Sequence, residues 1–296
     1  MSARAFAPAK VNLYLHVGAA AADGFHPLET LMVFADIGDE VSLAGTGGPA
    51  LRVSGRFAGG LEADDDNLVL RAARTLARRL GRRGDLPGLG LDKRLPVAAG
   101  LGGGSADAAA TLRLLNTVWG GGLDTSQLEA LAAELGSDVP ACVASRPVTA
   151  RGRGDVLAPA PILPGLPAVL VNPGAPCPTG VVYRAFDLSA SPCNPDPAPD
   201  SGLLPDPVAT ARWLGDLRND LEAPALNVAP VIGAVLERLR DAPETLLARL
   251  SGSGATCFAL CADDKSAGRL SAALARERPG WWVHPCRLGA PLEPDV

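Results

Sequence analysis

Short, largely apolar segments bounded by clusters of Ala, Gly and Asp fill the first hundred residues of the chain. Segments of this kind are typical of β-strands, because alternate side chains of a strand face a core. They predict strands at residues 10–17, 28–37, 40–43, 51–57 and 89–95. The N-terminal part is therefore expected to be rich in β-structure.

A different apolar spacing, every three or four residues, begins after Asn67 and predicts helices. Asp66 or Asn67 can cap the first helix and Gly81 can end it. Two more helices are expected at residues 105–119 and 124–135, the second opening with an Asp-x-x-Gln capping box.

Proline marks the passage into the second half of the chain. Thirteen of the 27 prolines lie between residues 159 and 207, which is typical of loops and of domain crossings. We place a domain boundary near residue 160, with one domain at residues 1–160 and the other at 161–296. The segment rich in Pro and Asp, residues 191–207, is expected to form a mobile loop.

The second domain is expected to mix strands and helices. The elements predicted there are strands at 168–172 and 256–261 and helices at 231–240, 244–250 and 264–278.

Composition limits the classes of function. The 296 residues are 47% hydrophobic, enough for a sizeable core, and their net charge of −5 gives no basic surface for nucleic acid or anionic membranes. No apolar run reaches the eighteen or so residues of a membrane span, and the first ten residues do not resemble a signal peptide. We expect a cytoplasmic protein, a monomer or a homodimer, whose partner is a small molecule rather than nucleic acid or a membrane.

Six cysteines and three histidines are the residues best suited to bind a transition metal. The cysteines form no Cys-x-x-Cys pair, and the histidines, at positions 16, 26 and 284, lack the spacing of metal ligands. We therefore expect reduced thiols, with neither a structural disulfide nor a zinc site.

The most informative segment is a glycine-rich loop that runs into an alanine-rich helix. It consists of Pro96, Val97, Ala98, Ala99, Gly100, Leu101, Gly102, Gly103, Gly104, Ser105 and Ala106. Glycines let successive N–H groups turn toward one point, and the helix N-terminus adds further donors, so the loop can hold a phosphate chain. It lacks the lysine of a Walker A motif and the glycine spacing of a dinucleotide-binding fingerprint. A tight turn that binds no ligand is the alternative.

Two charged residues and a second glycine turn add to this picture. Lys10 and Asn12 share one face of a mostly apolar strand, where Lys10 is either an exposed edge residue or paired with an anion. Asp138 follows a helix end, where a carboxylate usually caps the next helix. Residues 251–255 form a glycine turn ahead of a buried strand, which by itself indicates only a tight turn.

Taken in this order, residues 8–13, 96–106 and 251–255 resemble the three motifs of the GHMP small-molecule kinases. The resemblance spans nearly the whole chain. It implies an α+β fold with a ribosomal-protein-S5-like N-terminal domain and a ferredoxin-like α/β C-terminal domain. Finer strings, among them residues 23–26 and 219–222, are similar to the branch that phosphorylates the 2-hydroxyl of a cytidine-diphosphate-linked methylerythritol in the non-mevalonate route to isoprenoids.

For the nucleotide, the resemblance implies ATP as the phosphoryl donor, with Mg²⁺. The loop at residues 96–106 would wrap the triphosphate, Ser105 would touch Mg²⁺ or a phosphate oxygen, and Asn67 would lie near the nucleoside. Lys93 is a candidate to reach a phosphate. The alternatives are that Ser105 only caps the helix and that Lys93 extends into solvent. Asp107 is awkwardly close to the phosphates for a carboxylate, and related sequences often carry Asn there.

For the reaction, the resemblance implies that Lys10 lies beside Asp138 and keeps it ionised, while Asp138 accepts the proton of the attacking hydroxyl. Two rival functions stay open at this point: a kinase of another small alcohol, and a catalytically silent nucleotide-binding sensor on the same fold. The presence of both residues argues against the sensor, which has no need of the pair.

For the acceptor, the resemblance implies that Asn12 binds the diphosphate or the polyol hydroxyls, and that His26 and Phe25 bind the cytosine. Tyr183 would be the second aromatic residue of the cytosine site, with simple packing as the alternative. Family members usually carry Tyr in place of Phe25, a change that keeps stacking and loses a hydroxyl hydrogen bond.

Overall fold

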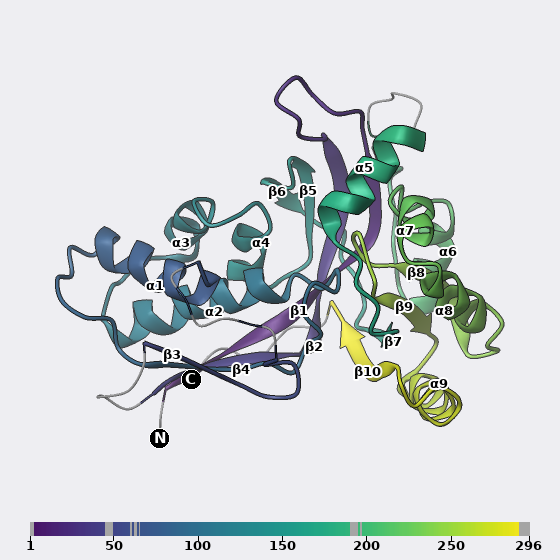
Figure 1. Ribbon diagram of the computed structural model, residues 1–296. Helices are drawn as coiled ribbons and strands as arrows, with labels where there is room; N and C mark the ends of the chain where they lie inside the picture. Colours follow the sequence, from purple (N-terminus) through teal and green to yellow (C-terminus); the bar gives the residue numbers. More distant parts are fainter. Residues whose placement is uncertain are drawn as a thin grey trace.

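The computed structural model describes residues 3–44, 50–59, 61, 64, 66–189, 195 and 197–289. Figure 1 shows an N-terminal lobe, with helices α1–α4 above strands, and a C-terminal lobe built from α5–α9 and β7–β10. The long strands β1 (Arg4–Val17) and β2 (Leu28–Leu43) run from one lobe toward the other. The second half of β1 contributes to contacts between the lobes, where the N–H of Leu15 donates to the carbonyl oxygen of Arg218.

The predicted strands at residues 28–37 and 40–43 are one continuous strand, β2, paired antiparallel with β1. The strand continues through Gly38 and Asp39, where Gly38 allows a close approach to β1. A Cβ at this glycine would lie 2.2 Å from the carbonyl oxygen of Ala7. The register also shifts between Pro8 and Lys10, which is typical of a β-bulge.

The rest of the N-terminal lobe covers one face of this pair with helices. Its strands are β3 (Leu51–Ser54), β4 (Leu89–Asp92), β5 (Val148–Gly152) and β6 (Val156–Pro159), and its helices are α1 (Leu68–Arg79), α2 (Gly103–Val118), α3 (Thr125–Ala132) and α4 (Val139–Ala144). The three predicted helices are confirmed as α1, α2 and α3. Helix α2 starts two residues before its predicted first residue, Ser105.

The C-terminal lobe contains a second group of strands in the order β10-β7-β9-β8. Its elements are β7 (Leu166–Asn172), α5 (Thr179–Ser189), α6 (Pro207–Gly215), α7 (Glu222–Val228), α8 (Val231–Arg240), β8 (Thr245–Leu250), β9 (Cys257–Cys261), α9 (Asp264–Glu277) and β10 (Trp282–Leu288). Strand β10 meets β2 where Leu288 pairs with Ala35.

The predicted helix at residues 244–250 is wrong, because this segment is strand β8. Its Leu, Ala and Arg residues favour a helix, but intrinsic propensity is a weak preference that tertiary packing overrides. The strand pairs with β9 and buries Ala248, Arg249 and Leu250. The predicted helices at 231–240 and 264–278 are confirmed as α8 and α9.

The predicted domain boundary near residue 160 falls between β6 and β7. A shared apolar core, which includes Val11, Leu13, Leu170 and Phe258, joins β1 to the strands of the C-terminal lobe. The division into two domains stays a prediction. Residues 191–194 and 196 of the predicted mobile loop, Cys193 among them, lie outside the described residues.

The described cysteines are buried free thiols, at positions 142, 177, 257, 261 and 286. Over the described part of the chain, no helix has the length and apolar character needed to cross a membrane.

Candidate active site

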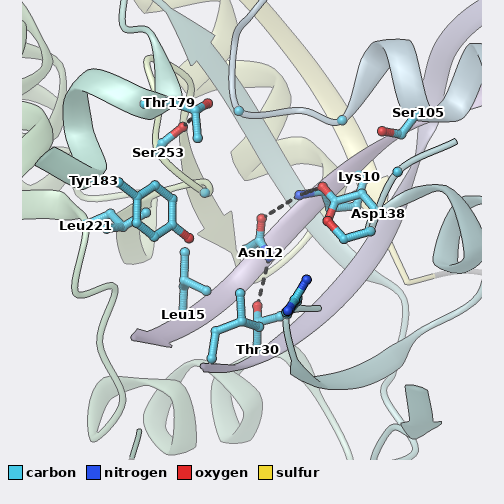
Figure 2. Close-up of a pocket in the computed structure, with 18 of the residues that line it drawn as sticks. Lys10, Asn12, Leu15, Thr30, Ser105, Asp138, Thr179, Tyr183, Leu221 and Ser253 are labelled. Carbon is cyan, nitrogen blue, oxygen red and sulfur yellow. Dashed lines mark hydrogen bonds and ion pairs between the residues drawn. The ribbon is translucent and has the colours of Figure 1, made fainter. Parts of the chain in front are cut away.

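A cavity of about 790 Å³ opens where the two lobes meet. Its walls come from β1, the glycine-rich loop, the start of α4, helix α5 and the turn before β9 (Figure 2). Most of the residues singled out in the sequence as chemically important face this one cavity.

Lys10 and Asp138 form an ion pair in this cavity, with 3.0 Å between Nζ and Oδ2. Lys10 is 5% exposed, so it is not a solvent-exposed edge lysine. Asp138 occupies the N-cap position of α4 but makes no capping hydrogen bond, and about a third of its side chain, 32%, is exposed. Its carboxylate is therefore paired with Lys10 and accessible from the cavity (Figure 2).

Arg113, on α2, connects the two segments that carry this pair. Its guanidinium donates to the carbonyl oxygen of Cys142 in α4 at 3.0 Å and to that of Phe6 in β1 at 2.5 Å. Because Lys10 lies on β1 and Asp138 begins α4, these bonds hold the two partners at their short separation.

Asn12 orders the polar side of β1 next to Lys10. Its Oδ1 accepts a hydrogen bond from Lys10 Nζ at 2.8 Å, and its Nδ2 donates to Thr30 Oγ1 at 2.8 Å (Figure 2). Thr30 in turn donates to the carbonyl oxygen of Tyr14 at 2.5 Å. Asn12 thus holds the ammonium group of Lys10, and its predicted contact with the acceptor stays a prediction.

The three sequence motifs meet at Ser251. Its hydroxyl accepts from the N–H of Asn12 at 3.2 Å and donates to the carbonyl oxygen of Gly100 at 2.9 Å. A Cβ on Gly100, whose φ is +75°, would lie 2.3 Å from the carbonyl oxygen of Ser251, so only glycine fits there. Asn219 supports the same turn by donating to the carbonyl oxygens of Leu250 and Gly252.

The glycine-rich loop presents its backbone to the cavity. The lining residues are Ala98, Ala99, Gly100, Gly102, Gly103, Gly104 and Ser105, whereas Pro96, Leu101 and Ala106 are buried and Val97 is exposed. Gly102, with φ +61°, is the N-cap of α2, so Ser105 does not cap this helix. The first N–H groups of α2 lack helical partners, and residues 102–105 line the cavity, an arrangement that suits phosphate.

Lys93 is placed differently from its predicted position. It is 3% exposed and lies beneath the loop, where Nζ donates to Asp39 at 2.5 Å and to Asp107 at 2.8 Å. Burial raises the pKa of Asp107 to about 7, against the opposing effect of the Lys93 ammonium. Lys93 therefore neither reaches into solvent nor lines the cavity. Asp107 is its partner.

Asn67 is the N-cap of α1, where its Oδ1 accepts from the N–H of Val69 at 3.0 Å. The next residue, Leu68, lines the cavity, but Asn67 does not. Its predicted contact with the nucleoside stays a prediction.

At the other end of the cavity, His26 Nε2 lies 2.7 Å from Asp187 Oδ1, and its ring centre is 4.9 Å from that of Tyr183. Burial, followed by the charge of Asp138, raises the pKa of Tyr183 to about 12. Phe25 is 53% exposed and also lines the cavity. The structure thus brings together the three residues predicted for the nucleobase.

The sequence analysis missed several lining residues at this end, namely Arg153, Thr179, Arg184 and Asp187, and it included Ser253 only as part of the glycine turn at 251–255. The Thr179 and Ser253 hydroxyls lie 2.9 Å apart (Figure 2). The glycine turn pointed to Ser253, but the others lie on α5 or on a hairpin turn, and no local pattern marks them.

Comparison with known proteins bears directly on this site. Residues 67–146 match the family described as GHMP kinases N terminal domain, and residues 205–279 match GHMP kinases C terminal. A 4-diphosphocytidyl-2-C-methyl-D-erythritol kinase from Caulobacter sp. (strain K31) is 53% identical over 97% of this chain and 99% of its own length. This chain belongs to the 4-diphosphocytidyl-2-C-methyl-D-erythritol kinases, a branch of the GHMP kinases. It is a small-molecule kinase.

Other relatives of this kinase agree. The enzyme of the same description from Hyphomonas neptunium is 50% identical over 96% of both chains. A crystal structure of a 4-(cytidine 5'-diphospho)-2C-methyl-D-erythritol kinase has a TM-score of 0.74 and 33% identity, covering 97% of this chain and all of the other. A homoserine kinase from Cytophaga hutchinsonii, with a TM-score of 0.69, is 21% identical over 96% of this chain and 94% of its own, so it shows the fold alone.

Proposed function

We propose that this kinase transfers the γ-phosphoryl group of ATP to the 2-hydroxyl of 4-diphosphocytidyl-2-C-methyl-D-erythritol, a step of the non-mevalonate route to isoprenoids. One observation carries the proposal. The Asp138 carboxylate, 3.0 Å from Lys10, faces a cavity with a phosphate-binding loop on one side and aromatic and imidazole rings on the other.

In this reaction the acceptor oxygen attacks the γ-phosphorus, the bond between this phosphorus and the β,γ-bridging oxygen breaks, and ADP leaves. The Asp138 carboxylate accepts the hydroxyl proton. The adjacent ammonium of Lys10 stabilises the carboxylate by Coulomb attraction and adds positive charge near the transferred group. Because phosphoryl transfer has a loose transition state, alignment and charge neutralisation by this pair count for more than strong basicity.

ATP would place its phosphates over the glycine-rich loop, where backbone N–H groups from Gly102 to Ser105 bind them. Mg²⁺ would neutralise phosphate charge. Within the described residues no cluster of three or more His, Cys, Asp or Glu side chains could hold a metal ion. A magnesium ion would be held by phosphate oxygens and water, and the Ser105 hydroxyl, which lines the cavity, is the protein group that would join them.

The acceptor would lie with its cytosine against Phe25, His26 and Tyr183. A flat base suits aromatic faces, and an imidazole can hydrogen-bond to its edge. His26 is already oriented by Asp187, which prepares the ring for a directional contact. Arg184, an exposed guanidinium in the same wall, suits the diphosphate.

The test is ADP production by the purified protein with Mg-ATP and the cytidyl acceptor, beside homoserine and mevalonate as acceptors. We expect turnover with the cytidyl acceptor alone. Turnover confined to homoserine or mevalonate would assign another small alcohol. ATP binding without turnover on any acceptor would make the chain a nucleotide-binding sensor.

A further inference from the structure

The loop between β1 and β2 carries Phe25 and His26 into the cavity, and we call its residues 21–26 the acceptor arm. Backbone bonds tighten it, from the N–H of Ala21 to the carbonyl of Phe25 at 2.8 Å and from the N–H of Gly24 to the carbonyl of Ala21 at 2.9 Å. Asp23 also accepts the N–H of Phe25 at 3.0 Å. These bonds order the arm internally but do not fix it against either lobe.

Each lobe holds one ring of the acceptor arm. From the C-terminal lobe, Asp187 and Tyr183 on α5 contact His26. From the N-terminal lobe, Arg153 lies with its guanidinium carbon 4.1 Å from the centre of the Phe25 ring and forms an ion pair with Asp23. Phe25 is thus held by a cation–π contact and, through the arm, by a salt bridge.

Arg153 lies in a hairpin turn that is held by several hydrogen bonds. It lies in the turn between β5 and β6, where its N–H donates to Asp155 Oδ1 at 3.0 Å and Gly154 closes the turn onto Arg151 at 3.0 Å. Strand β5 pairs with both β2 and β6. The turn can therefore act as a fixed point for the acceptor arm.

We propose that Arg153 is a positioning residue for acceptor recognition, which covers one face of the Phe25 ring so that the other face is presented to the nucleobase. The inference rests on the proposed function. A phenyl ring has no hydroxyl through which a hydrogen bond could orient it, so the Phe25 ring gets its orientation from the guanidinium that lies on it. Because the guanidinium is already engaged by the Asp23 carboxylate and the ring, it acts on the acceptor through Phe25 rather than by binding the diphosphate.

The test compares the steady-state kinetics of Arg153→Gln and wild type. We expect the KM for the cytidyl acceptor to rise about tenfold, since one exposed cation–π contact and one surface ion pair are lost together. The kcat and the KM for ATP should stay within about twofold, because the Lys10–Asp138 pair and the glycine-rich loop are untouched. Arg278→Gln is the matched control, since Arg278 lies over Trp281, 5.6 Å from that ring's centre, outside the cavity.

A double-mutant cycle separates positioning from direct binding. In a Phe25→Leu background, which lacks the ring, Arg153→Gln should change the acceptor KM by less than about twofold. An equal rise in both backgrounds would mean that the guanidinium binds the acceptor itself, and an unchanged KM in Arg153→Gln would remove it from recognition; either result overturns the proposal. Wild type that cannot use the cytidyl acceptor would instead contradict the proposed function.

Discussion

The end of the cavity where we propose that the nucleotide binds, the nucleotide end, presents backbone, whereas the end proposed for the acceptor, the acceptor end, presents side chains. At the nucleotide end, seven lining residues belong to one continuous segment, and the largest side chain among them is that of Ser105. At the acceptor end, Phe25, Arg153, Tyr183 and Ser253 come from four separate segments of the two lobes. Backbone N–H groups suffice to bind a phosphate chain, because its negative charge is the same in every nucleotide. Recognition of a nucleobase, in contrast, needs aromatic rings and directional hydrogen bonds from side chains.

This difference explains how one fold can serve several acceptors. The backbone cradle depends on the fold, while the acceptor end depends on individual side chains that can be exchanged without altering it.

The first test of this contrast between the two ends concerns the Lys10–Asp138 ion pair, which lies between them. Asp138→Asn keeps the size of the side chain but removes the proton acceptor. We expect kcat to fall by about 10²–10⁴ while the affinities for ATP and for the acceptor change little, because neither end is altered. Single-turnover kinetics and ATP titration measure the two effects. Asp85→Asn, at an exposed position, is the control, and unchanged kcat in Asp138→Asn would assign the proton transfer elsewhere.

The second test disturbs the nucleotide end alone. Gly103→Val places a branched side chain in the first turn of α2, where a Cβ would already lie 3.3 Å from Lys93 Nζ. We expect the KM for ATP to rise about tenfold or more, because the side chain blocks N–H groups of the cradle, while the acceptor KM stays near wild type.

Gly268→Val is the matched control for this substitution, since Gly268 lies in α9 and a Cβ there meets nothing within 4 Å. This variant places the same β-branched side chain in a helix away from the cavity, so it measures the general effect of a glycine-to-valine change in a helix. Equal ATP affinity in both variants would contradict the cradle.

The contrast between one continuous segment and several separate segments also explains which parts of the site the sequence could predict. The cradle is local, so the run from Gly100 to Ser105 is enough to indicate its position, whereas the phosphate that it is expected to bind stays a prediction. The alternatives for Lys10 and Asp138 could not be decided from either residue alone, since strand exposure and helix capping are both common. Only their distance of 3.0 Å, across 128 residues of chain, shows that each is the other's partner.

Lys93 and Arg153 show why the rest could not be predicted. A lysine at a strand end next to a phosphate loop suits phosphate binding, yet the fold places two carboxylates, Asp39 and Asp107, around it beneath the loop. Arg153 lies in a hairpin turn 128 residues from Phe25, and only the pairing of β5 with β2 brings them together. Long-range sheet pairing, rather than local pattern, sets both positions.

The last expected effect is on stability rather than on kinetics, and it concerns the charge beneath the cradle. Burial raises the pKa of Asp107 from 3.8 to about 7, so this carboxylate binds a proton more tightly in the folded protein than in the unfolded chain. Such a group stabilises the fold at low pH, and this contribution is lost as pH rises toward 7. Asn at this position cannot titrate.

The stability of Asp107→Asn relative to wild type should therefore increase between pH 5.5 and pH 8, by roughly 2 kcal/mol. Urea unfolding at the two pH values measures it, with Asp85→Asn as an exposed control. Because two carboxylates share one ammonium, a proton on Asp107 leaves the Asp39–Lys93 pair neutral below the phosphates. If the stabilities of Asp107→Asn and wild type instead change with pH in the same way, Asp107 is ionised at both pH values. The two carboxylates then leave one negative charge beneath the cradle that Lys93 does not neutralise. Mg²⁺ and the N–H groups of the cradle would have to offset this charge when ATP binds.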